Sequence, residues 1–334
     1  MLKKTKPYHH IGVIGAGSWG TALALAAANA GRSVTLWARE PMLAAQMSTA
    51  RENAAYLPGV SLPGAVMPTA VLADAAAAEA VLMAVPAQHL RASLRTASTS
   101  FRDGTPVVIA AKGVEQKSGK LLNEVLAEVS PNVVPAILSG PSFARDVARR
   151  LPTAVTIAAN MEVALRLQAT LGSAHFRPYA SDDVIGVALG GAAKNVYAIA
   201  CGIVEGLGLG ESARAALLAR GFAELCRLGE AMGGRIETLM GLSGLGDLVL
   251  SATSRSSRNF AFGVAVGSGA PRAQLFASDC PLAEGATTAP ALVARAARHG
   301  IELPVAEAVA QILDGSLALE AAAPRLMMRP LKTE

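Results

Sequence analysis

The sequence predicts an α/β protein of two domains: a doubly wound, mostly parallel sheet in residues 1–185 and an all-helical domain in residues 186–334. Three observations carry this prediction. Short β-branched runs alternate with alanine-rich stretches in the first half, which is the pattern of βαβ units. A glycine-rich turn follows the first run, and long glycine-punctuated helical stretches replace the strands after about residue 183. A chain of 334 residues also exceeds the usual size of a single core.

The first expected strand, residues 10–15, leads into the turn GAGSWG and an alanine-rich helix. In such a turn Gly15 allows the sharp bend, Gly17 lets a pyrophosphate approach the backbone, and Gly20 lets helix and strand pack closely. The N–H groups at the helix start also attract anions. We therefore expect a Rossmann-type dinucleotide-binding domain. The alternative is a glycine-rich turn that binds no ligand.

The chain then offers further strands, and their carboxyl ends are where such sheets bind ligands. The expected ranges are 33–38, 80–86, 106–113, 134–140, 153–159 and 174–181. Arg39 follows the second strand at the position where an acidic residue indicates NAD, and an arginine there accommodates a 2′-phosphate. NADPH is therefore the expected preferred cofactor, and Glu40 leaves NADH usable. A solvated Arg39 without a ligand is the alternative.

Two later strands end in candidate binding residues. Lys112 stands at the carboxyl end of the stretch expected as the strand at 106–113, where its amine can meet a phosphate or a carbonyl oxygen, although it could also be a surface lysine. Gly140 and Ser142, in the stretch SGPSFA, permit a close backbone approach and offer one hydroxyl. Alone, this stretch could be an ordinary turn.

Lys194 is the only charged residue within residues 184–204. This run is long enough to cross a bilayer. Its Gly and Ala content and its central lysine instead favour a buried helix of a globular protein. Burial disfavours an unpaired ammonium group, so we expect a carboxylate or a ligand beside Lys194, which could then act as a general acid or base. A lysine that reaches the surface along its apolar stem is the alternative.

The expected complement lies further along the helical half. Asp247 stands in the glycine-rich stretch GLSGLGDL, as a helix cap or as a functional partner. Ser257, Arg258 and Asn259 bring together a hydroxyl, a forked cation and an amide, which suits a phosphate group. A helix start capped by serine explains the same residues, and the two readings are compatible because helix starts bind anions.

Composition excludes several classes of function. Hydrophobic residues make up 52% of the chain and charged residues 16%, so the chain should fold. The net charge of +5 is scattered and aromatic residues are only 4%, which argues against a nucleic-acid partner. No metal-ligand spacing occurs, and no metal is expected. The basic N-terminus runs straight into a strand, so we expect a cytoplasmic protein without a membrane span.

Seven motifs occur together and in order: GAGSWGTALA, AAKGVE, SGPSFA, GAAKNVYAIACGI, GLSGLGDL, SRNFAFG and AEGATTA. Over about residues 10–325 the chain resembles the bacterial NAD(P)-dependent glycerol-3-phosphate dehydrogenases. The resemblance implies reversible reduction of dihydroxyacetone phosphate to sn-glycerol 3-phosphate, a phospholipid precursor. It leaves a homodimer open.

The resemblance also implies roles for individual residues. Lys194 and Asp247 would be catalytic, with Lys194 as the proton acceptor in the oxidative direction. The implied cofactor contacts are Gly15, Gly17, Ser18, Trp19, Gly20, Arg39, Lys112, Ala144, Arg258, Leu282 and Glu284. The implied substrate contacts are Lys112, Gly140, Ser142, Lys194, Asp247, Ser257, Arg258 and Asn259. The stretch ASDCPLAEG has leucine where a valine is common, which departs from the family pattern at Leu282.

Two rival functions remain open at this stage. A two-domain reductase of a β-hydroxyacid or a ketopantoate-like substrate would need a carboxylate site in place of the phosphate site. A catalytically silent NADPH-binding sensor would need no proton-transfer residue, yet both Lys194 and Asp247 are present.

Overall fold

The computed structural model describes residues 6–277 and 283–322, and it divides the chain into two compact units. The sheet unit comprises Met1–Lys112 and Leu121–Ala188, and the helical unit comprises Gly113–Lys120 and Leu189–Glu334. The short segment Gly113–Lys120 therefore belongs with the helical unit although it follows a strand of the sheet. The sequence pattern did not anticipate this assignment.

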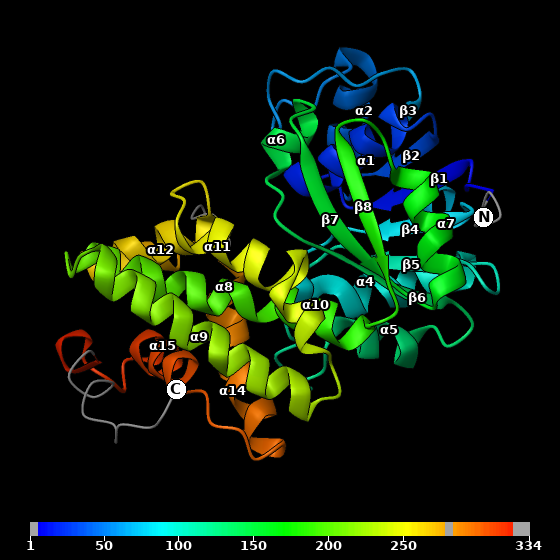
Figure 1. Cartoon of the computed structure of the whole chain (residues 1–334). Coiled ribbons are helices and arrows are strands. Elements are labelled where there is room, and N and C mark those ends of the chain that lie inside the picture. Colours follow the sequence, from blue (N-terminus) through cyan, green and yellow to red (C-terminus); the bar gives the residue numbers. More distant parts are fainter. Residues whose placement is uncertain (1–5, 278–282, 323–334) are drawn as a thin grey trace. The chain divides into compact units, whose positions relative to one another are not determined.

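The sheet unit contains an eight-stranded sheet of order β3-β2-β1-β4-β5-β6-β7-β8 (Figure 1). Its strands are β1 (His10–Ile14), β2 (Ser33–Trp37), β3 (Val66–Thr69), β4 (Ala80–Met83), β5 (Pro106–Ile109), β6 (Val134–Ser139), β7 (Thr153–Ala158) and β8 (Phe176–Ser181). Neighbouring strands are parallel throughout, except that β6 and β7 are antiparallel. The expected α/β class is confirmed.

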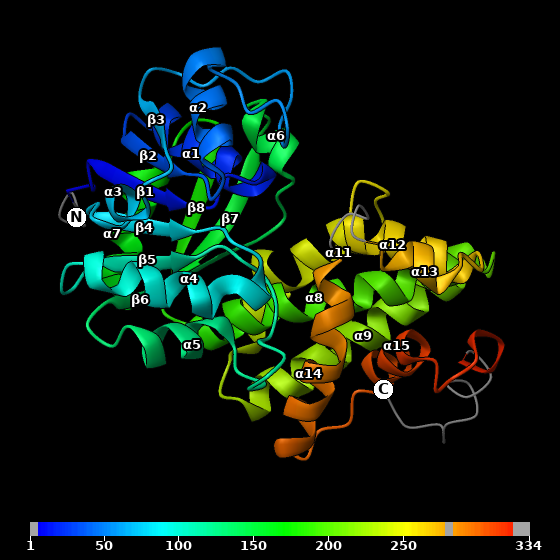
Figure 2. The same ribbon diagram turned by 180° about the vertical axis from the view of Figure 1, so that it is seen from behind.

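Helices cover both faces of this sheet (Figure 2). They are α1 (Ser18–Asn29), α2 (Pro41–Ala50), α3 (Leu72–Ala76), α4 (Leu90–Ala97), α5 (Leu122–Val129), α6 (Ala144–Ala148) and α7 (Met161–Leu171). Side chains of α1, α2, α6 and α7 share one core with alternate strand residues, and those of α3, α4 and α5 share the other. In β4, for example, Leu82 faces the first core and Met83 the second. Burial on both faces explains the continuous apolar runs that mark these strands in the sequence.

The sequence pattern did not predict one strand of the sheet. β3 reads VMPT, in which Met67 is exposed and Pro68 cannot donate a ladder hydrogen bond. Proline is tolerated there because β3 is one of the two edge strands and pairs, among the described strands, only with β2. A short edge strand with a proline lacks the β-branched run by which the other strands were recognised.

After β8 the described residues form helices only. They are α8 (Val184–Gly206), α9 (Glu211–Ala231), α10 (Ile236–Met240), the π-helical turn η3 (Leu242–Gly246), α11 (Asp247–Ala252), α12 (Arg258–Gly267), α13 (Arg272–Leu275), α14 (Glu284–Arg298) and α15 (Pro304–Asp314). The predicted helical second half is thus observed.

Helix α8 is the centre of the helical unit. It is long and apolar enough to cross a membrane, yet 83% of its most apolar window is buried inside the protein. Glycines let its neighbours approach closely: a Cβ built on Gly202 of α8 would lie 2.2 Å from the Phe260 carbonyl oxygen of α12. A helix surrounded by others in this way needs an apolar surface on every side, which explains its membrane-like sequence.

Candidate functional site

The glycine-rich turn joins β1 to α1 with each glycine under a different constraint. Gly15 has φ +114°, which favours glycine. A Cβ on Gly20 would lie 1.8 Å from the Gly15 carbonyl oxygen, so a side chain there would separate helix from strand. A Cβ on Gly17 would meet no heavy atom within 4 Å. The turn is therefore closed on the protein side and open at Gly17.

The backbone carbonyl oxygens and the backbone N–H groups of this turn differ in their hydrogen bonding. The carbonyl oxygens of Ala16 and Gly17 accept hydrogen bonds from Asn53 and from the Thr21 N–H. The N–H groups of Ala16, Gly17 and Ser18 have no hydrogen-bond acceptor within residues 6–277 and 283–322. Unpaired N–H groups at a helix start form an anion-binding concavity. The turn therefore fits the pyrophosphate of a dinucleotide.

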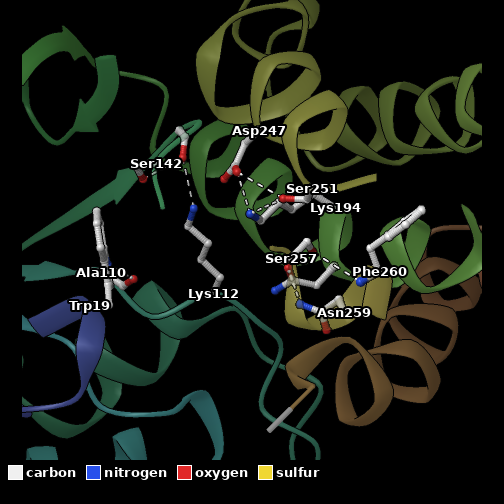
Figure 3. Close-up of polar contacts among 12 residues, drawn as sticks. Trp19, Ala110, Lys112, Ser142, Lys194, Asp247, Ser251, Ser257, Asn259 and Phe260 are labelled. Atoms are coloured by element: carbon white, nitrogen blue, oxygen red, sulfur yellow. Dashed lines mark hydrogen bonds and ion pairs between the residues drawn. The ribbon is translucent and has the colours of Figure 1, made fainter. Parts of the chain in front are cut away.

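Two side chains anchor the start of α1 through hydrogen bonds to other segments. Ser18 Oγ donates to the Tyr56 carbonyl oxygen at 2.7 Å. Trp19 Nε1 donates to the Ala110 carbonyl oxygen at 3.2 Å, just past β5 (Figure 3). The turn is thereby tied both to the segment after α2 and to the carboxyl end of β5, two strands away from β1 in the sheet.

Arg39 lies beyond the carboxyl end of β2, and its side chain is 77% exposed. Its Nε lies 3.0 Å from Glu40 Oε1, whose side chain is also mostly exposed. Exposed pairs of this kind contribute little free energy, so the guanidinium can exchange this partner for a phosphate at small cost.

Lys112 and Gly140 meet at the carboxyl ends of the parallel neighbours β5 and β6. Lys112 Nζ donates to the Gly140 carbonyl oxygen at 3.2 Å, and Ser142 Oγ donates to the same oxygen at 3.0 Å (Figure 3). Gly140 has φ +146°, and a Cβ on it would lie 2.8 Å from Val155 Cα. A cation, a hydroxyl and a compact backbone thus share this edge of the sheet.

The helical unit holds a buried ion pair. Lys194 on α8 is 8% exposed, and Asp247, the first residue of α11, is 1% exposed. Lys194 Nζ lies 2.5 Å from Asp247 Oδ1 and 2.8 Å from Ser251 Oγ (Figure 3). The carboxylate expected beside Lys194 is therefore Asp247. Its charge favours the ammonium form of the lysine, which can then donate a proton.

The start of α12 combines capping with cross-helix contacts. Ser257 is the N-cap, and its hydroxyl accepts from the Phe260 N–H at 3.3 Å (Figure 3). Asn259 Nδ2 donates to Asn195 Oδ1 at 2.9 Å, and Asn259 Oδ1 accepts from the Gly285 N–H at 2.9 Å. Ser257 thus caps α12, Asn259 joins α12 to α8 and α14, and Arg258 between them is exposed to solvent.

Three residues implied by the resemblance remain. Two of them begin helices, and the third lies outside the residues that the structure describes. Ala144 is the first residue of α6 and packs against the core of the sheet unit. Glu284 is the first residue of α14 and is partly buried. Leu282 lies outside the described residues. Within the described ranges, no group of three or more His, Cys, Asp or Glu side chains could hold a metal ion.

Sequence reasoning missed two residues of these clusters. Ser251 stands four residues after Asp247, so both lie on one face of α11 toward Lys194. That spacing was a usable signal. Asn195 follows Lys194, and its contact with Asn259 spans 64 residues of sequence. No local pattern predicts a pairing at that separation.

Comparison with known proteins agrees with this geometry. The family model described as NAD-dependent glycerol-3-phosphate dehydrogenase N-terminus matches residues 10–164, and the corresponding C-terminus model matches residues 183–324. A protein of Parvibaculum lavamentivorans named glycerol-3-phosphate dehydrogenase (NAD(P)+) is 54% identical over 331 residues, which cover 99% of each chain. A protein of the same name from a Bradyrhizobium species is 56% identical over 98% of each chain.

A solved structure agrees as well. The crystal structure of glycerol-3-phosphate dehydrogenase from Coxiella burnetii superposes with a TM-score of 0.91 at 38% identity, covering 96% of this chain and 99% of that one. Sequence models, relatives and structure thus agree over nearly the whole chain. The chain belongs to the NAD-dependent glycerol-3-phosphate dehydrogenase family.

Proposed function

We propose that the chain catalyses the reversible NAD(P)H-dependent reduction of dihydroxyacetone phosphate to sn-glycerol 3-phosphate and so feeds glycerophospholipid synthesis. The observation that carries this proposal is the buried Lys194–Asp247 pair, with Nζ and Oδ1 2.5 Å apart, in a chain of this family. A protein that only binds a cofactor does not need a buried ammonium–carboxylate pair. Burying such a charged pair costs free energy.

The division of labour that we propose follows the two halves of the chain. Residues 1–185 act as the dinucleotide-binding domain, and residues 186–334 act as the substrate and catalytic domain. Gly15, Gly17, Ser18, Trp19, Gly20, Arg39, Lys112, Ala144, Arg258, Leu282 and Glu284 contact the cofactor. Lys112, Gly140, Ser142, Lys194, Asp247, Ser257, Arg258 and Asn259 contact the substrate.

NADPH is the proposed preferred cofactor, with NADH as a usable second. Support comes from Arg39, whose side chain is exposed beyond β2 and, among the described residues, is engaged in a weak surface pair with Glu40. A guanidinium can bind a 2′-phosphate through paired charge-assisted hydrogen bonds. The free N–H groups of the turn at Gly17 suit the pyrophosphate of either cofactor.

The protein's own residues provide the acid–base and electrostatic parts of the reaction. When bound, the nicotinamide cofactor supplies the hydride that reaches the carbonyl carbon. Lys194, as an ammonium group, stabilises the negative charge that develops on the substrate oxygen and donates a proton to it. Asp247 stabilises the ammonium form, and Ser251 fixes the direction of Nζ. Once it has donated its proton, Lys194 is a neutral amine, and in the oxidative direction this neutral amine accepts the proton from the substrate hydroxyl.

The phosphate of the substrate is the proposed ligand of Arg258 at the start of α12. An arginine at a helix N-terminus combines a forked cation with the positive end of the helix dipole. Ser257 and Asn259 act beside it, and their helix contacts hold the start of α12 in place. Binding energy from this phosphate can be used to orient the reacting carbonyl.

The deciding experiment measures oxidation of NADPH and of NADH with dihydroxyacetone phosphate, beside pyruvate and ketopantoate. We expect turnover with dihydroxyacetone phosphate and little with either keto acid. Preference for a keto acid would replace this proposal with that of a hydroxyacid dehydrogenase. Cofactor binding without turnover of any phosphorylated ketone would make the chain a nucleotide-binding protein.

The proposed location is the cytoplasm, where the substrate and both cofactors are present. The proposed partners are small phosphorylated molecules, with neither nucleic acid nor a membrane. A homodimer is the assembly to test first, by sedimentation of the purified chain.

A further inference from the structure

We propose that Asn53 is a positioning residue for the phosphate-binding turn, because its amide fixes the direction in which the Gly17 N–H points. This inference rests on the proposed dinucleotide function of that turn. Asn53 lies between α2 and β3, outside every motif that carries the family resemblance.

The contacts of Asn53 define its orientation. Its side chain is fully buried, at 0% exposure. Asn53 Nδ2 donates to the Ala16 carbonyl oxygen at 2.8 Å and to Thr21 Oγ1 at 2.8 Å. A carbonyl oxygen can only accept, so the atom facing Ala16 must be the amide nitrogen. One side chain therefore joins the middle of the turn to the first turn of α1.

The Ala16 carbonyl matters because it shares a peptide unit with the Gly17 N–H. In a trans peptide the C=O and the N–H point in opposite directions. The described residues contain no cis peptide bond. Holding the Ala16 oxygen toward Asn53 therefore turns the Gly17 N–H the other way. If that peptide flipped, a carbonyl oxygen would replace an N–H donor and would repel a pyrophosphate.

The segment that carries Asn53 is itself held by hydrogen bonds. Its own carbonyl oxygen accepts from the Leu57 N–H at 2.8 Å, which closes a tight turn. Ser18 Oγ donates to the Tyr56 carbonyl oxygen at 2.7 Å. The segment after α2 is thus bonded to the phosphate-binding turn at two points, one on either side of Gly17.

Packing alone does not explain an asparagine here. Asn53 Oδ1 is buried and has no hydrogen-bond partner in the described parts of the chain. A buried polar atom without a partner costs stability. An apolar side chain of similar size would fill the space without that cost, so the two bonds made by Nδ2 are what the asparagine contributes.

The test compares ligands with and without a pyrophosphate, using Asn53→Ala in the full chain. We expect the Kd of ADP-ribose and the KM of NADPH to rise about tenfold, the scale of one lost charge-linked hydrogen bond. The Kd of adenosine 2′-monophosphate should stay unchanged, because this fragment carries no pyrophosphate. The kcat with saturating NADPH should also stay near that of the wild type.

Thr170→Val is the matched control. Thr170 is fully buried in α7, and its hydroxyl accepts from the Tyr8 N–H at 3.0 Å, so the substitution removes a buried hydrogen bond elsewhere in the sheet unit. It should lower the melting temperature and leave every ligand constant unchanged. If Asn53→Ala does not fold, Asn53→Ser serves in its place, since its shorter side chain cannot bridge Ala16 and Thr21.

The outcomes separate the two proposals. Asn53 variants that lower the melting temperature but bind ADP-ribose as the wild type does would overturn the positioning role. An equal loss for ADP-ribose and adenosine 2′-monophosphate would overturn it too, because the defect would then be general. A wild-type protein that binds neither ADP-ribose nor NADPH would instead contradict the dinucleotide function.

Discussion

The proposed proton transfer depends on the amine of Lys194, so removing this side chain is the most direct test of the mechanism. Lys194→Ala deletes the proton donor and removes the ammonium group from beside the buried Asp247 carboxylate. We expect kcat to fall by at least ~10²-fold, the lower range for an acid–base group. Because the glycine-rich turn lies on β1 and α1, the Kd of NADPH should change little.

The control for that substitution is Lys117→Ala, which removes an exposed lysine of the Gly113–Lys120 segment. Its turnover should match that of the wild type. Steady-state assays of both variants, with circular dichroism to verify folding, measure the difference. Near-normal turnover of Lys194→Ala would remove this residue from the mechanism.

Arg39 carries the proposed preference for NADPH. Arg39→Ala should raise the KM of NADPH at least tenfold, about the value of one charge-assisted hydrogen bond to the 2′-phosphate. The KM of NADH should stay nearly constant because that cofactor has no such phosphate. Arg102→Ala is the control, since Arg102 is also exposed but precedes β5, on the side of the amino ends of the parallel strands, whereas Arg39 follows the carboxyl end of β2. Equal changes for the two cofactors would contradict the assignment.

Single residues show where reading the sequence succeeds and where it stops. Lys194 stood out because a lone charge in an apolar run must find a partner, and the structure supplies Asp247. Asn53 gave no such signal, because a buried asparagine in a loop looks like any turn residue. Its partners Ala16 and Thr21 lie more than 30 positions away, and only the folded chain brings them together.

At the scale of elements, the contact between α8 and α12 depends on glycines. A Cβ on Gly263 would lie 2.2 Å from the Ile199 carbonyl oxygen, which is backbone and cannot move aside cheaply. Gly263→Ala should therefore force the helices apart and lower the free energy of unfolding by about 2 kcal/mol, as overpacked cores do. Urea denaturation measures this change.

Gly229→Ala on α9 is the matched substitution for that experiment. Its Cβ would meet Leu239 Cδ1 at 2.4 Å, the tip of a flexible side chain that can shift. Alanine also favours a helix by about 1 kcal/mol relative to glycine. We expect little net change, or slight stabilisation. A similar loss in both variants would mean that helix contacts in general, and not the α8–α12 backbone approach, limit stability.

Helices and strands were easier to predict from the sequence when their residues are buried in a regular pattern. The strands buried on both faces were recognised from their uninterrupted apolar side chains and their starts were expected correctly, but the expected ends of β4 and β5 ran three and four residues too far. The edge strand β3 was missed, since exposure at Met67 and the proline after it erase that signal. The antiparallel direction of β7 against β6 was also not predicted, because strand direction depends on the path of the connection and not on the strand's own residues.

At the scale of the whole molecule, Glu224 links folding stability to pH. It lies on α9, is 3% exposed, and accepts from the Val305 N–H of α15 at 2.7 Å and from the Tyr197 hydroxyl of α8 at 3.3 Å. Burial raises the pKa of Glu224 from 4.5 to about 7, against the opposing effects of these hydrogen bonds and of Arg227. Three helices therefore meet on one carboxyl group that titrates near neutral pH.

The sign of the effect follows from where the proton is held more tightly. Between about pH 4.5 and 7 the folded chain keeps the Glu224 proton and the unfolded chain loses it, so stability falls as pH rises. The loss can reach ~3 kcal/mol, from about 1.4 kcal/mol for each pKa unit. Glu224→Gln keeps the shape and an acceptor for Val305 but cannot titrate. The variant should therefore gain stability relative to the wild type as pH rises from 5 to 8.

Melting temperatures of the two proteins at several pH values across that range test the linkage, because only the change in their difference reports on Glu224. Glu230→Gln is the control, since Glu230 lies on the same helix and is exposed. Its difference from the wild type should be nearly the same at every pH. If the Glu224→Gln difference is equally flat, this carboxyl group does not titrate in the folded protein between pH 5 and 8. The junction of α8, α9 and α15 would then be held by its hydrogen bonds in one protonation state throughout.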